Sequence, residues 1–237
     1  MSKKTIRNTI ILSLAAIVLV VATVLTTLAY MTSSAAVANT FSVGDVSISM
    51  YETKTDDMGI PQETGKKTAS GNHYTLIPGH NYTKDPTIYI NELSEKSYLF
   101  IKVRNDIAKI EEKHKTEYPT IATQLETNGW KKHHETMTDI VYVYAPNGTV
   151  GYIGNDECDP VNVFQQFTIE HEATQETLKL YNAARVSITA YAIQDSNNFG
   201  TFGSDAAVSA AWDAIVATYD YVPDYGNTTN PSTPVEE

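Results

Sequence analysis

The stretch SYLFIKVR, residues 97–104, alternates its side chains with a period of two, as a β-strand does. Leu99, Ile101 and Val103 share one face of this strand, and the intervening positions share the other. The run PTIYINE, residues 86–92, alternates in the same way. Because only a short polar segment separates the two runs, we predict that they pair as adjacent antiparallel strands.

Further strand-like runs follow along the chain, joined by turns and without the strand–helix–strand alternation of a parallel sheet. They are residues 140–145, 149–153, 161–169 and 185–193. This pattern predicts an all-β fold, an antiparallel β-sandwich that forms one domain over residues 30–219.

The run NTFSVGDVSISMYE, residues 39–52, is a strand pattern with one fault. Its apolar positions before Gly44 have one parity, and those after Asp45 have the other. A β-bulge at this dipeptide would return both sets to the same face. We therefore predict a single bulged strand here.

Two regions have helical character. Residues 106–117 are charged and helix-prone, and residues 119–128 predict a second short helix that Gly129 ends. Together they predict a short helical insertion over about residues 106–128. A C-terminal helix is predicted over residues 205–219. Its apolar stripe, expected to lie on the sandwich, comprises Val208, Trp212, Ile215 and Tyr219.

The first 29 residues are organised as a secretory signal peptide: basic residues, then an apolar run, then small residues. The apolar run is long enough that an uncleaved membrane anchor is the structural alternative. Composition favours cleavage after Ala38, with the position after Ala29 as the second candidate. With cleavage, the chain contacts a membrane only before its signal is removed.

The chain is acidic, with a formal net charge of −11, and loss of residues 1–29 would remove three bases and no acid. This charge disfavours nucleic acid and anionic lipid as partners, because both bind basic surfaces. Residues 220–237 are acidic and contain three prolines, so we predict a disordered tail. Cys158 is the single cysteine, which excludes an internal disulfide.

Several stretches, in order along the chain, resemble the TasA/camelysin family of Gram-positive bacteria. They are LAYMTSSAAVANTFSVGDVSISM (28–50), LIPGHNYTKDPTIYI (76–90), NGWKK (128–132), VYVYAPNGTV (141–150), VSITAYAIQ (186–194) and AAWDAI (210–215). One departure is the acidic residue that the family often carries soon after the first aromatic residue, which residues 31–34 lack.

The resemblance implies a jelly-roll-like sandwich that is secreted to the extracellular matrix or cell surface and joins biofilm fibres. It implies that a dedicated ER-type signal peptidase cuts between Ala29 and Tyr30, and not after Ala38 as composition favours. The implied partners are further copies of the chain or related matrix subunits. We expect a structural protein with no catalytic residues and no cofactor.

Cleavage at Tyr30 would release a segment that could carry assembly. Residues 30–50 of one subunit could complete a sheet of the next by adding a strand, and such a head-to-tail contact propagates as a filament. The alternative is that the segment folds back into its own sheet. The predicted assembly strand comprises Asn39, Thr40, Phe41, Val43, Val46, Ile48 and Met50.

Two other functions stay open, a secreted camelysin-like metalloprotease and a monomeric cell-surface binding module. Zinc proteases use His-Glu-x-x-His on a helix. His171-Glu172 and His134-Glu135 each begin this pattern, but neither is completed by the second histidine.

The calcium candidates are three acidic residues of one short segment. Their oxygen atoms are the ligands that Ca²⁺ prefers, although their spacing is not that of an EF-hand. A solvated turn is the alternative for this segment. The candidates are Asp156, Glu157 and Asp159.

Overall fold

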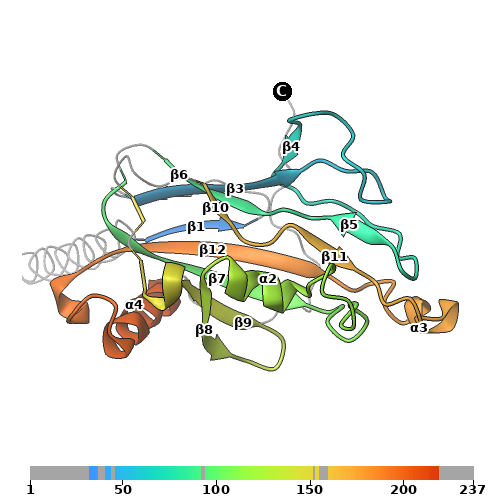
Figure 1. Ribbon diagram of the computed structural model, residues 1–237. Coiled ribbons are helices and arrows are strands. Elements are labelled where there is room, and N and C mark those ends of the chain that lie inside the picture. The colour runs from blue at the N-terminus through green and yellow to red at the C-terminus, as the bar shows by residue number, and fades with distance from the viewer. Residues whose placement is uncertain are drawn as a thin grey trace, which may run out of the picture.

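Antiparallel sheets dominate the computed structural model, and helices are few (Figure 1). The prediction of a β-rich fold with antiparallel sheets is therefore confirmed. Among the residues that the structure describes, no helix has the length and apolar character needed to cross a membrane. The predicted signal, anchor and tail lie outside the described residues, which are 32–36, 41–43, 46–91, 94–151, 153–154 and 160–218.

The larger layer is a five-stranded antiparallel sheet. In spatial order it comprises β1 (Thr32–Ala36), β12 (Val186–Gln194), β7 (Ser97–Asn105), β9 (Ile140–Tyr144) and β8 (Trp130–Glu135). The two long strands β7 and β12 pair along their whole length, from Ser97 opposite Gln194 to Asn105 opposite Val186. The β8–β9 hairpin forms the far edge.

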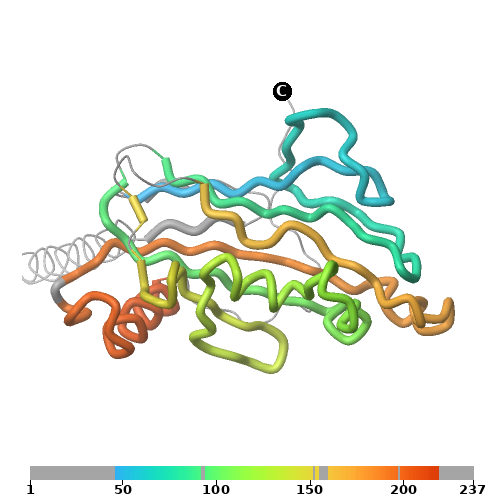
Figure 2. The backbone as a smooth tube through the Cα atoms, viewed as in Figure 1, coloured from blue at the N-terminus to red at the C-terminus, as the bar shows by residue number. Residues whose placement is uncertain are grey.

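The smaller layer lies across the core from the first (Figure 2). Its path comprises β10 (Val161–Asn162), β6 (Thr87–Ile90), β3 (Val46–Thr53) and β2 (Phe41–Val43), and β4 (Lys67–Thr68) pairs with the end of β3. A two-stranded ribbon of β5 (Asn81–Thr83) and β11 (Gln166–Thr168) continues the β6–β10 pair. The predicted strand over residues 161–169 is thus two short strands.

The prediction that residues 86–92 and 97–104 pair with each other is wrong, because β6 and β7 belong to different sheets. Ile88 of β6 and Ile101 of β7 are both fully buried in the same core, which they enter from opposite layers. The alternation of a strand shows which face is buried but does not identify the neighbouring strand, so this crossing was not visible in the sequence.

The single bulged strand predicted over residues 39–52 is also wrong. β2 and β3 are separate antiparallel neighbours, with Val43 opposite Val46 and Phe41 opposite Ile48. Residues directly opposite each other in an antiparallel pair share a face. The antiparallel pairing of β2 with β3 therefore places the apolar residues before Gly44 and those after Asp45 on one face of the sheet. A β-bulge would have had the same result.

The helical insertion is half confirmed. α2 (Ile121–Thr127) forms where the second short helix was predicted, with Thr120 as its N-cap. The helix predicted over residues 106–117 is absent: this segment forms turns, and Glu111 makes a β-bridge with Ile169. The turn predicted at Pro146-Asn147-Gly148 forms as the 3₁₀ turn η1 (Pro146–Gly148). A short helix α3 (Gln175–Lys179) and the 3₁₀ turn η2 (Asn197–Phe199) were not predicted.

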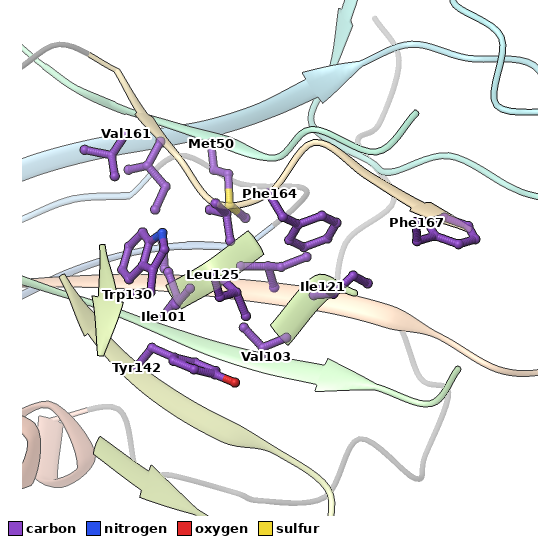
Figure 3. Packing of buried hydrophobic residues seen from close by; sticks show 14 of the residues in the cluster. Met50, Ile101, Val103, Ile121, Leu125, Trp130, Tyr142, Val161, Phe164 and Phe167 are labelled. Carbon is purple, nitrogen blue, oxygen red and sulfur yellow. The ribbon is translucent and has the colours of Figure 1, made fainter. Parts of the chain in front are cut away.

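The core lies between the two layers, and the C-terminal helix packs outside them. Leu99 and Ile101 of β7 belong to the inner cluster. Ile101 lies there with Trp130 and Leu125 (Figure 3). The opposite face of β7 is covered by α4 (Asp205–Thr218), as predicted. The buried side chains of α4 on this outer face are Ala207, Val208, Ala211, Trp212 and Ile215.

Candidate functional site

One open side of the sandwich is closed by α2. This helix projects Ile121 and Leu125 into the core (Figure 3). The residues that follow it bind the edge strand β10: the Asn128 side-chain amide donates to Asn162 Oδ1 at 3.1 Å, and Trp130 Nε1 donates to the Asn162 carbonyl at 3.2 Å. Side chains from this segment therefore tie the edge of the larger sheet to the edge of the smaller one.

The other open side is closed by the N-terminal segment. β1 is the edge strand of the larger sheet and pairs with β12, from Thr32 opposite Ile193 to Ala36 opposite Thr189. β2 is the edge strand of the smaller sheet and pairs with β3. β1 also lies beside β2 and β3. Residues 32–43 thus supply one edge strand to each layer.

The strands beneath this segment carry core residues. Ala190 and Ala192 of β12 are fully buried, as are Val46 and Ile48 of β3. Without β1 and β2, the backbone donors and acceptors of β12 and β3 would form two unpaired edges beside an apolar core. Such an edge is a template for pairing with a strand of another chain.

The structure divides the predicted assembly strand. Phe41 and Val43 lie in the edge strand β2, whereas Val46, Ile48 and Met50 lie in β3, which has β2 on one side and β6 on the other. Asn39, Thr40, Ala29 and Tyr30 lie outside the described residues. Thr32–Ala36 belongs to the segment of residues 30–50 that was predicted to be donated, but a strand was not predicted there, because small and polar side chains give it no apolar alternation.

Of the candidate metal and protease residues, the structure describes only the two His-Glu pairs, which lie in different elements. Asp156, Glu157 and Asp159 lie outside the described residues. His171 is in a turn and contacts Glu112, and His134 is in β8. Within the described ranges, no group of three or more His, Cys, Asp or Glu side chains could hold a metal ion.

A cleft of about 1010 Å³ opens between the loop of residues 70–76 and the segment of residues 175–187. Its apolar lining residues include Ile107 and Phe167. The described residues that line it include three lysines, one arginine and one histidine and no acid, although the chain as a whole is acidic. They are Lys54, Lys84, Lys179, Arg185 and His73, of which Lys84 is paired with the buried Glu52.

A buried polar cluster adjoins this cleft. Lys84 Nζ lies 2.7 Å from Glu52 Oε2, and the Asn72 amide donates to Glu52 Oε1 at 2.9 Å. Nearby, the Tyr74 hydroxyl donates to the Thr83 carbonyl at 2.9 Å, and burial raises the pKa of this phenol. The cluster links the end of β3 to the loops that flank β5.

The described residues therefore present three features that could carry a function. They are the edge formed by β1 and β2, the cationic cleft, and the polar cluster around Glu52. Each joins segments that are distant in sequence, so none of them is a local motif. Comparisons with protein-family models, with curated proteins and with solved structures found no match for this chain.

Proposed function

We propose that this chain is a secreted structural protein that assembles into extracellular matrix fibres, as its TasA/camelysin-like stretches imply. The two sheets would then be those of a jelly-roll-like sandwich, and export would end with cleavage between Ala29 and Tyr30. The observation that supports assembly is the position of residues 32–43, which provide an edge strand to both sheets on one side of the sandwich.

Exchange of this segment between copies would conserve its backbone hydrogen bonds. The acceptor strand makes the same ladder with a donor from its own chain or from a neighbour, so the difference in free energy is small. The effective concentration of the tethered segment favours the closed monomer, and a high protein concentration favours exchange. β1 reads TSSAA and has no large apolar side chain that would hold it to one copy.

The geometry of this exchange leads to an open polymer. The donor segment of one copy would occupy the acceptor edge of the next, and a head-to-tail contact of this kind does not close on itself unless the rotation forms a ring. Of the predicted segment of residues 30–50, we propose that only β1 and β2 are donated. β3 is an inner strand, and its removal would break the smaller sheet.

The first test is electron microscopy of a chain that begins at Tyr30 beside one that begins at Val46. The shorter chain retains β3 and lacks both edge strands. We expect filaments from the longer chain only. If the longer chain stays monomeric at high concentration, self-assembly is wrong, and if both form filaments, the N-terminal segment is not the donor.

A pair of engineered cysteines tests whether β1 pairs with β12 of its own chain or with β12 of another copy. Ala35 lies opposite Ala190, so Ala35→Cys with Ala190→Cys, in a Cys158→Ser background, places two thiols across the β1–β12 pair. We expect a disulfide-linked ladder of oligomers from filaments on a non-reducing gel. Ser34→Cys with Ala190→Cys is the control, because a shift of one residue puts the thiols on opposite faces. Cross-linked monomers alone would show that the segment folds back.

The cationic cleft favours a second candidate, a monomeric module that binds an anionic cell-surface polymer. Lys179 and Arg185 are exposed at its rim. On this reading, Lys179→Ala with Arg185→Ala would abolish retention of the chain on isolated cell walls. Lys131→Ala with Lys132→Ala, on the edge strand β8, is the charge-matched control. Equal retention of the two double variants would rule out the cleft as the binding site.

A further inference from the structure

The side chains of Lys84, Glu52 and Asn72 meet in an arrangement that assembly does not require. Lys84 Nζ lies 2.7 Å from Glu52 Oε2, and the lysine and glutamate side chains are 5% and 1% exposed. The Nδ2 atom of Asn72 donates to the other oxygen of the same carboxylate at 2.9 Å. One buried carboxylate therefore contacts a primary amine and a primary amide at once.

The remaining atoms of the Asn72 amide are also held. Its carbonyl oxygen accepts from the backbone N–H of Thr55 at 2.9 Å, and its nitrogen donates to the Thr53 carbonyl at 2.8 Å. These bonds fix the plane of the amide, whose nitrogen shares the Glu52 carboxylate with Lys84. A backbone N–H directed at a carbonyl oxygen stabilises the negative charge that develops when a nucleophile attacks the carbonyl carbon.

We propose that Lys84 and Asn72 become joined by an isopeptide bond, with Glu52 as the group that transfers protons. Glu52 takes a proton from the ammonium group, and the neutral amine attacks Cγ of Asn72 to form a C–N bond. The tetrahedral oxyanion forms at Oδ1, on the Thr55 N–H. Its collapse breaks the bond between Cγ and Nδ2.

The protons and charges balance in this step. Two protons pass from Nζ to Nδ2 through Glu52, so that the leaving nitrogen departs as ammonium and Glu52 ends as the carboxylate it began as. The product is a secondary amide between the two side chains. A positioned carboxylate can carry out both transfers as a general base and a general acid. Neither an oxidant nor a reductant is required.

The bond would fasten the loop before β5 to the residue that follows β5. It would close a short loop beside the end of β3 and reduce the conformational entropy of the unfolded chain, as a disulfide does. The sequence contains a single cysteine and so lacks an internal disulfide. This covalent link is independent of whether the N-terminal segment is exchanged between copies.

The test is the intact mass of the purified chain. We expect a mass lower than that of the sequence by one molecule of ammonia, and a proteolytic peptide in which residues 72 and 84 are joined. Lys84→Arg is the matched variant: it keeps the positive charge beside Glu52, but a guanidinium stays protonated and does not attack. This variant is expected to have the full mass of its sequence.

Two results would overturn the proposal. The first is a native chain with the full mass of its sequence, which would leave the three residues joined only by hydrogen bonds and an ion pair. The second is the same loss of ammonia in Lys84→Arg, because the loss would then come from Asn72 and its own backbone. Glu52→Gln adds a separate check: if it folds, it is expected to retain the full mass.

Discussion

The imidazole of His171 lies against the buried carboxylate of Glu112, with Nδ1 3.0 Å from Oε2. The other oxygen of this carboxylate accepts from the backbone N–H of His114 at 2.9 Å. The pKa of Glu112 is lowered, first by the His114 N–H and then by His171. One side chain thus connects the turns after β7 to the segment after β11.

This contact predicts a pH-dependent contribution to stability. Because the pKa of Glu112 is lowered by folding, the ionised carboxylate stabilises the fold above its ordinary pKa of 4.5, and this contribution is lost as the pH falls through the folded value. We expect Glu112→Gln to lower the free energy of urea unfolding near neutral pH, and to have a smaller effect at an acidic pH well below 4.5, where the carboxylate becomes protonated in the folded chain as well.

The exposed neighbour of His171 provides the control for this experiment. Glu172→Gln removes the same charge without touching either hydrogen bond, so its effect is expected to be small at both pH values. An equal destabilisation by Glu112→Gln at both pH values would show that packing, and not ionisation, accounts for the contribution.

A comparison of Gly59 and Gly65, which have similar backbone conformations, distinguishes the cost of backbone strain from the cost of overpacking. Gly59 and Gly65 have φ of +72° and +77°, but a Cβ at Gly59 would lie 2.8 Å from the Tyr82 Cα, whereas Gly65 faces open space. Alanine at either position costs about 1 kcal/mol of backbone strain. Gly59→Ala adds about 1–3 kcal/mol of overpacking. Thermal unfolding of both variants measures the difference, and equal losses would contradict the close approach.

The closure by α2 depends on an apolar anchor. Leu125 is 1% exposed in the core cluster, so Leu125→Ala is expected to lower the free energy of unfolding by about 3 kcal/mol. Glu126→Ala, at the exposed neighbouring position, is expected to change it by less than about 0.5 kcal/mol. Urea unfolding gives both values. Similar small effects would mean that α2 is not held by the core.

The attachment of α4 depends on Trp212, whose ring lies 5.4 Å from Phe100 and 5.6 Å from Tyr191 between centroids. Trp212→Ala is expected to cost about 3–4 kcal/mol and to increase amide hydrogen exchange throughout the helix. Asp213→Ala, on the exposed face, is the control. Unchanged exchange in Trp212→Ala would show that the helix is held by its other contacts.

Much of the inner core was predictable because alternation is a local property. The face shared by Leu99, Ile101 and Val103 is buried as expected, and so are Trp212 and Ile215 of the C-terminal helix. The turns over residues 106–117 were predicted as a helix, because Ile107 and Ile110 have helical spacing. That spacing also suits a turn that puts both side chains into the core.

The candidate site was predictable only in part. The stretch near the N-terminus was singled out for assembly, but its division into the edge strands β1 and β2 and the inner strand β3 was not visible. A strand such as TSSAA has no apolar pattern. Its place is determined by the edge of β12 that does not pair with β7. The contacts of Glu52 with Lys84 and Asn72 were not predicted either, since nothing local marks them.

The sequence by itself determined the β-rich class of the fold, the inward faces of the long strands, and the positions of α2 and α4, because periodicity and capping act over a few neighbouring residues. Only the tertiary structure decided which strands pair, that β6 and β7 occupy opposite layers, and that Glu52 meets Lys84 and Asn72. Such pairings depend on contacts between distant segments. An alternating strand is equally able to accept any complementary edge, so its partner follows from the packing of the whole domain.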